Sequence, residues 1–165
     1  KVVYFDFFGK AEPIRMMLAK AGVSFEDERI KELDEKHEGR GSTRVWLGPF
    51  VELDDGTKLF QSVAIYNFIS ATHGFHPETP LEVHRGEAIY EAIVVDFFYK
   101  CLPSVLFAPP SPERDEKLVE IAEKYQTAAG HLARILSQRE DKFICGNKLT
   151  THDFTVGGVW LNLFT

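Results

Sequence analysis

Two places in the sequence carry residues that suit hydrogen bonding to a small molecule. Tyr4 falls late in an apolar run typical of a first β-strand, and strand ends are where an open α/β sheet forms its ligand crevice. A phenol, whose pKa is about 10, stays neutral near physiological pH and can donate a hydrogen bond. Gln61 and Ser62 open an expected helix, where free N–H groups and the positive end of the helix dipole suit a carboxylate.

Each of these positions also has a structural interpretation. Taken alone, Tyr4 is more typical of a half-buried strand tyrosine whose hydroxyl contacts a backbone carbonyl. Ser62 is equally typical of a simple helix cap, and the two roles are compatible. His73, His76 and Glu78 are loosely spaced and typical of a solvated linker, so we expect no metal site.

Composition limits the classes of function. The 165 residues are 44% hydrophobic and 13% aromatic, which predicts a folded core rather than disorder. A net charge of −6 argues against a nucleic-acid partner, and no apolar run has the length of a membrane span. Cys101 and Cys145 lie in apolar helical patterns typical of buried side chains, without a C-x-x-C motif or a disulfide framework. We therefore expect a reducing compartment, the cytoplasm.

The elements that position Tyr4 and Gln61 follow from local signals. An apolar strand over residues 1–7 leads to a helix with Pro13 in its first turn, ended by Gly22, and to a second strand over 23–30. Strand, helix and strand in so few residues predict a parallel βαβ unit. Strands over 50–53 and 57–60 flank an Asp55-Gly56 turn, and a helix follows from Ser62. One mixed sheet with helices on both faces is the simplest packing.

The rest of the chain is expected to be helical. We predict an α/β domain over residues 1–75, a proline-containing linker over 76–81 and an all-helical domain over 82–165. The helical domain has an apolar pattern over 89–100, with Asp96 on the apolar face, and a long amphipathic helix over 118–136. A capping-box pattern follows at 150–153, flanked by Leu149 and Phe154, which are spaced to form a hydrophobic staple. We expect Asp153 to be structural. The chain stops inside an expected helix, so we expect further C-terminal helices to be missing from it.

Four motifs in order give a resemblance that covers nearly the whole chain. YFDFFGKAEPIR at 4–15, GPFVELDDG at 48–56, QSVAI at 61–65 and FICGNKLTTHDF at 143–154 together resemble the cytosolic glutathione S-transferases. The tyrosine-type opening is most similar to the sigma class. The resemblance implies a thioredoxin-like N-terminal domain (β-α-β-β-β-α), a helical domain and a homodimer.

The resemblance also implies a site. It assigns Tyr4 to activation of the glutathione sulfur, and the absence of Ser and Cys over residues 5–12 favours Tyr over the Ser-type and Cys-type variants. The cysteinyl backbone would pair with Gly48 beside a cis Pro49, whereas a trans proline is the default without the resemblance. Lys10, which stands where the family usually has Arg, would also contact glutathione. Trp46 and Leu47 would bind its glycine end, and Gln61 and Ser62 its γ-glutamyl carboxylate. Asp96 would reach the glutathione of the partner subunit.

The expected function is detoxifying transfer of glutathione, as co-substrate, to small hydrophobic electrophiles. One alternative is a non-catalytic relative, crystallin-like or ligand-carrying, which Lys10 and the irregular segment 31–46 suggest. Another is a sigma-like prostaglandin isomerase. A disulfide oxidoreductase lacks the cysteine that it would need near the first strand. The sequence does not identify the electrophile.

Overall fold

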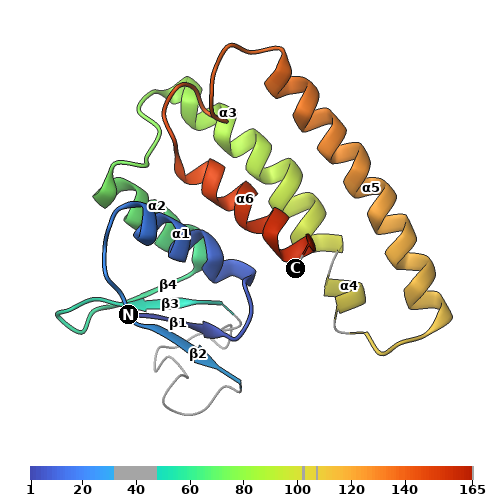
Figure 1. Ribbon diagram of the computed structural model, residues 1–165, viewed down its shortest axis with the longest axis horizontal. Coiled ribbons are helices and arrows are strands. Elements are labelled where there is room, and N and C mark those ends of the chain that lie inside the picture. The colour runs from blue at the N-terminus through green and yellow to red at the C-terminus, as the bar shows by residue number, and fades with distance from the viewer. Residues whose placement is uncertain (32–47, 102, 107, 165) are drawn as a thin grey trace. The chain divides into compact units, whose positions relative to one another are not determined.

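The fold is that of a computed structural model of the whole chain (Figure 1), which describes residues 1–31, 48–101, 103–106 and 108–164. The predicted site residues Trp46 and Leu47 lie outside the described residues. The chain divides into two compact units, one of residues 1–76 with 160–165 and one of residues 77–159. Of the helices that the structure describes, none is long and apolar enough to cross a membrane.

The first unit is built on a four-stranded mixed sheet in the order β2-β1-β3-β4. Strand β1 (Val2–Phe5) is central; β2 (Asp27–Ile30) pairs with it in parallel, with Tyr4 opposite Arg29. On the other side, β3 (Phe50–Glu52) pairs antiparallel with β1 and with β4 (Lys58–Phe60). The predicted βαβ unit and hairpin are both confirmed.

Local signals explain the helices of this unit. Helix α1 (Glu12–Lys20) has Pro13 in its first turn and is followed by Gly22 at a φ of 70°, as predicted. The short helix η1 (Gly9–Ala11) precedes α1, and α2 (Ser62–His73) follows β4. Helices α1 and α2 contact each other on the same face of the sheet (Figure 1). Helices on both faces were expected, and those described in this unit cover one.

The core of the first unit lies between β1 and these two helices. Strand β1 is buried because both of its faces are apolar, which suits a central strand. The apolar residues of α1 recur at helical spacing, so they form one stripe against the sheet. The fully buried side chains here include Val2, Val3, Ile14, Met17 and Ile65.

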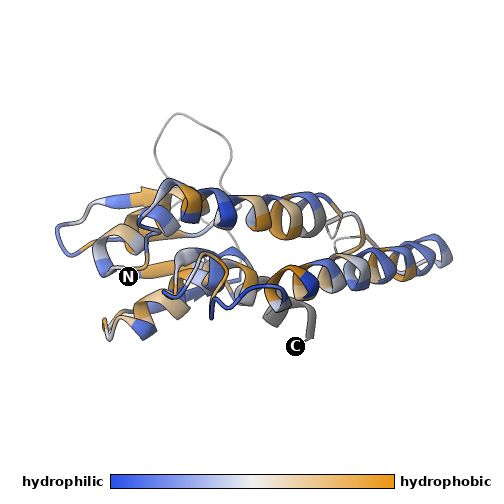
Figure 2. Ribbon diagram, turned by 90° about the horizontal axis from the view of Figure 1, so that it is seen from above, coloured by the Kyte–Doolittle hydropathy of each residue, from blue (hydrophilic) through white to orange (hydrophobic). Residues whose placement is uncertain are grey.

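The second unit is helical. Helix α3 (Pro80–Tyr90) starts in a capping box formed by Thr79 and Glu82, and a π-helical stretch, η2 (Glu91–Tyr99), continues it. After α4 (Pro103–Leu106), Ser111 caps the long helix α5 (Pro112–Ser137), in which hydrophobic residues recur among a majority of hydrophilic ones (Figure 2). Helix α6 (Thr151–Phe164) ends the described chain. Helix α5 begins before the predicted pattern because Ser111 and Pro112 supply the start signal.

Asp153 anchors the start of α6. Its carboxylate accepts hydrogen bonds from the backbone N–H groups of Ile144, at 2.9 Å, and Thr150, at 2.8 Å. The Thr150 hydroxyl also donates to this carboxylate, at 3.0 Å. This is the carboxylate half of the predicted capping box, and it confirms a structural role for Asp153.

Candidate functional site

Tyr4 is held in the central strand β1 with little exposed surface. The residue is 5% exposed, and its ring lies 5.5 Å from the Phe5 ring and 5.1 Å from the Phe7 ring, measured between centroids. Gly9 closes the hydroxyl end: a Cβ atom added there would lie 2.7 Å from Cε1 and 2.9 Å from Oη of Tyr4. Gly9 has a φ of 45°, so both the backbone and the space require glycine. The phenol is therefore more deeply buried than a crevice residue would be.

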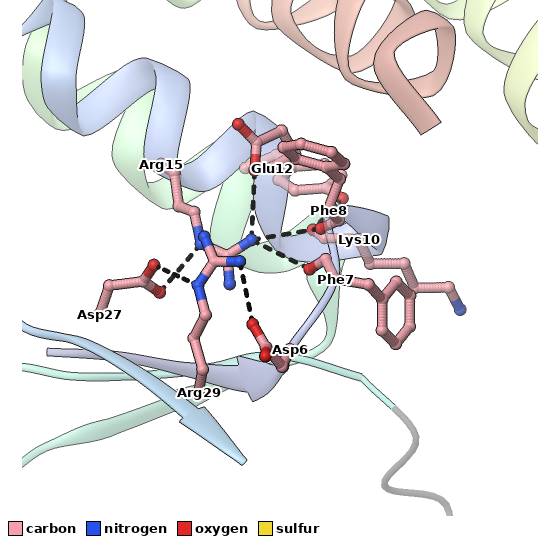
Figure 3. A network of polar contacts seen from close by, with 9 residues as sticks. Asp6, Phe7, Phe8, Lys10, Glu12, Arg15, Asp27 and Arg29 are labelled. Atoms are coloured by element: carbon pink, nitrogen blue, oxygen red, sulfur yellow. Dashed lines mark hydrogen bonds and ion pairs between the residues drawn. The ribbon is translucent and has the colours of Figure 1, made fainter. Parts of the chain in front are cut away.

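A buried arginine fixes the loop that follows Tyr4 (Figure 3). The Arg15 side chain from α1 donates through Nη1 to the backbone carbonyls of Phe7, at 3.2 Å, and Phe8, at 3.3 Å. It also bonds the carboxylates of Glu12, at 3.2 Å, and Asp27, at 2.9 Å. Arg15 was not among the predicted site residues. An arginine on the apolar stripe of a helix, three residues after a glutamate, is the signal that identifies it.

The network extends to the edge strand. Arg29 on β2 bonds the second carboxylate oxygen of Asp27 at 2.9 Å, and it reaches Asp6 at 3.4 Å. Burial alone would raise the pKa of Asp27, but the hydrogen bonds from Arg15 and Arg29 outweigh it and hold that pKa below its usual value. The loop after β1 is thus connected to α1 and to β2 by charged groups.

Lys10 is half-buried next to this loop. Burial lowers the pKa of its ammonium group, and Figure 3 shows the side chain directed away from the Arg15 network. Its backbone carbonyl accepts a hydrogen bond from the Tyr66 hydroxyl, at 2.6 Å. Because Tyr66 lies on α2, this bond joins the loop after β1 to the helix that starts at the predicted site residues Gln61 and Ser62.

The Gly48–Pro49 bond corrects the prediction. No cis peptide bond occurs among the described residues, so this bond is trans and the expected cis form is wrong. Trans is the lower-energy form of an X–Pro bond by roughly 0.5–1 kcal/mol, and the cis expectation rested on the resemblance alone. Pro49 is fully buried and Gly48 half-buried, immediately before β3.

The start of α2 carries a backbone outlier. Gln61 occupies the N-cap position with a φ of 68°, the one positive φ at a described residue other than glycine. It makes no side-chain capping hydrogen bond, and Ser62 is the first helical residue rather than the cap. Left-handed backbone at a non-glycine residue costs free energy and clusters at ligand sites. The N-terminal turn of α2 therefore lacks the usual side-chain cap at the point where an anion was predicted.

Asp96 differs from its prediction. Its side chain is 60% exposed, so the expected place on the apolar face is wrong, and its carboxylate pairs with Lys100 at 2.5 Å. The reason is the π-helical geometry of η2, which closes each turn over five residues rather than four and changes which residues share a face.

Thiol and imidazole meet in the second unit, an arrangement that the sequence analysis missed. Buried Cys145 has its Sγ 3.3 Å from Nδ1 of His152, whose Nε2 lies 3.4 Å from a carboxylate oxygen of Glu87. The Thr150 hydroxyl oxygen lies 3.2 Å from the same Sγ. Burial raises the pKa of the Cys145 thiol, as is typical of a structural cysteine. Within the described ranges, no group of three or more His, Cys, Asp or Glu could hold a metal ion.

Comparison with known proteins decides the family. The chain is 30% identical over 165 residues to human glutathione S-transferase A3, which covers 94% of this chain and 70% of the relative. It is 32% identical over 163 residues to glutathione S-transferase alpha M14 of Sus scrofa, covering 91% and 67%. The chain belongs to the glutathione S-transferase family. No family model matches this transferase.

Solved structures support the same fold for the transferase. The structure of the glutathione S-transferase Blo t 8 matches with a TM-score of 0.82 at 26% identity, over 99% of this chain and 77% of the other. Monomeric Na-GST-3 of Necator americanus matches with a TM-score of 0.72 at 27% identity, over 93% and 75%. Prostaglandin synthase D of Nilaparvata lugens, at 20% identity and a TM-score of 0.77, is similar in fold. The transferase therefore has the predicted thioredoxin-like domain followed by helices.

Proposed function

We propose that this transferase joins the sulfur of glutathione to small hydrophobic electrophiles, with the Tyr4 hydroxyl stabilising the thiolate. The thiolate attacks an electrophilic carbon, a C–S bond forms, and the leaving group departs with its electron pair. A free thiol with a pKa of about 8.5 is only about 3% ionised at neutral pH. Lowering that pKa by two units requires about 2.7 kcal/mol, and one hydrogen bond to a charged group supplies roughly 1.5–3 kcal/mol.

The observation that carries this proposal is the position of the Tyr4 hydroxyl, which lies beside Gly9 at the end of the central strand. Arg15 fixes the loop around it through two backbone carbonyls. A donor held in a fixed place stabilises an anion without reorganising, which is the general requirement for electrostatic catalysis. The tyrosine type and a likeness to the sigma class are parts of the same proposal.

Other residues would hold the tripeptide. The N-terminal turn of α2 at Gln61 and Ser62 would receive the γ-glutamyl carboxylate, and its missing side-chain cap supports this assignment. The backbone at Gly48 and Pro49 would bind the cysteinyl part, although the bond between them is trans. Lys10 would add positive charge near the sulfur. Trp46 and Leu47, outside the described residues, would line the glycine end.

Assembly and location complete the proposal. We propose a homodimer in which Asp96 reaches the partner's glutathione, because this carboxylate is exposed and a surface ion pair such as the one with Lys100 contributes little free energy. Light scattering decides between dimer and monomer. The two cysteines, Cys101 and Cys145, are unpaired, which favours the reducing cytoplasm.

The test is a titration of bound glutathione. The thiolate absorbs in the ultraviolet, so its absorbance against pH gives the pKa of the sulfur in the complex. We expect Tyr4→Phe to raise this pKa by about two units, towards about 8.5. Tyr66→Phe is the matched control, since it removes a hydroxyl that bonds the Lys10 carbonyl instead. An unchanged thiol pKa in Tyr4→Phe would refute the role of Tyr4.

A further inference from the structure

The burial of Tyr4 conflicts with the role proposed for it, and the conflict points to a moving part. A hydroxyl that donates to a sulfur must touch that sulfur, yet Tyr4 is only 5% exposed. Some group beside Oη must therefore leave before glutathione can reach it. The inference that follows rests on the proposed function, because it concerns access to the same hydroxyl.

The ring of Phe7 borders the space next to the hydroxyl. A Cβ atom placed on Gly9 would lie 2.5 Å from Cε2 of Phe7 and 2.9 Å from Oη of Tyr4, so both atoms border one point above Gly9. The Phe7 and Tyr4 rings are tilted by 52° with centroids 5.1 Å apart. Phe7 also stacks on Phe5, at 6.1 Å and 16°. Three aromatic rings thus meet at the end of β1.

Phe7 is the ring that is free to move. Its side chain is 46% exposed, whereas Tyr4 belongs to the core and Phe5 is half-buried. Exposed side chains change rotamer within picoseconds to nanoseconds, and a ring in contact with water has room for it. The backbone, in contrast, is held at the Phe7 carbonyl by Arg15 and at the Phe7 N–H by the Phe5 carbonyl, at 2.8 Å.

We propose that Phe7 is a side-chain gate over Tyr4. With the ring in the position described, it covers the side of the hydroxyl that it faces; rotation of the ring opens that side while Arg15 keeps the loop in place. Glutathione therefore binds the open rotamer, and the closed rotamer reduces both its affinity and its association rate. A contact between two aromatic rings corresponds to roughly 2- to 12-fold in an equilibrium constant, which sets the size of the effect.

The experiment compares Phe7→Ala with Phe8→Ala. Phe8 is half-buried and is the matched control, since its carbonyl is bound by the same Arg15 atom and none of the ring pairs among the described residues joins it to Tyr4. The first measurement uses no glutathione: tyrosine-labelled protein is exposed to a neutral paramagnetic reagent, and the relaxation of the Tyr4 ring signal reports its access to solvent. The second is stopped-flow binding of glutathione.

We expect Phe7→Ala to increase the relaxation of the Tyr4 signal and to raise the glutathione association rate and affinity by roughly 2- to 12-fold. Phe8→Ala and Phe7→Tyr should behave like the unmodified protein. Equal relaxation in Phe7→Ala and the unmodified protein would overturn the gate, as would increased relaxation with unchanged binding. Failure of the proposed function gives a different result: neither the unmodified protein nor any variant binds glutathione. In that case the gate proposal is refuted together with the proposed function. Circular dichroism verifies that each variant is folded.

Discussion

Replacing Gly86 by alanine is expected to destabilise the second unit, although alanine is the better helix former. Gly86 lies in α3, and a Cβ atom there would sit 2.2 Å from Nδ1 and 2.5 Å from Cγ of His152. The imidazole has little room to retreat, because it is buried and has Cys145 near one ring nitrogen and Glu87 near the other. The added methyl group therefore displaces the ring.

The size of the effect follows from three contributions. Alanine gains about 1 kcal/mol over glycine in a helix interior. Overpacking a buried contact costs roughly 1–3 kcal/mol, and loss of the hydrogen bond between Cys145 and His152 costs about 1 kcal/mol. The net expectation is a loss of roughly 1–3 kcal/mol in the free energy of unfolding. Gly130→Ala in α5 is the matched control, because no atom outside the adjoining residues and backbone of its own helix lies within 4 Å of the added Cβ, and it should stabilise by up to about 1 kcal/mol.

Urea unfolding followed by far-ultraviolet circular dichroism measures both variants. The same substitution in a His152→Ala background isolates the contact, since the ring that the methyl group meets is then absent. There, Gly86→Ala should be neutral or stabilising, like Gly130→Ala. If Gly86→Ala is stabilising in the original background, or costs the same with and without His152, the close approach of α3 and this imidazole is wrong.

Two further predictions concern charged groups. Asp153→Ala removes the acceptor for the N–H groups of Ile144 and Thr150, so the free energy of unfolding should fall by roughly 1–3 kcal/mol. The control, Asp115→Ala on the exposed side of α5, should change it by about 0.5 kcal/mol or less. Equal effects of the two substitutions would contradict the anchoring role of Asp153. Because its folded-state pKa is depressed, Asp27 stabilises the fold fully above its unfolded-state pKa of about 3.9 and loses this effect as the pH falls through the lower folded value. The stability difference between the unmodified protein and Asp27→Asn should thus shrink in urea titrations below about pH 4, and a difference independent of pH would exclude the ion pairs as its cause.

Local signals predicted most of the elements in the first unit. Pro13 and Gly22 mark the two ends of α1, and the Asp55-Gly56 turn marks the hairpin, because each depends on the backbone preference of one or two residues. The second strand was predicted over 23–30 but pairs only over Asp27–Ile30. Pairing is decided by the neighbouring strand, which a local pattern does not contain.

The site was less predictable, because its properties depend on distant residues. The motifs gave Tyr4, Lys10 and Gln61, but the burial of Tyr4 results from Gly9 and from the rings around it. The exposure of Asp96 follows from π-helical geometry, for which no sequence signal was available. The meeting of Cys145 with His152 requires a glycine on another helix, Gly86.

The hydrogen bonds from Arg15 to the loop have a consequence for how the sequence of this protein can diverge. The guanidinium donates to the carbonyl oxygens of Phe7 and Phe8, which are backbone atoms that every amino acid possesses. These two hydrogen bonds therefore do not depend on which side chains stand at the two positions. Mutations at these two positions can therefore accumulate while the main chain keeps its course. The loop beside the proposed thiol site thus combines a fixed frame with interchangeable surfaces, so that descendants of this sequence can acquire new substrate preferences by single substitutions.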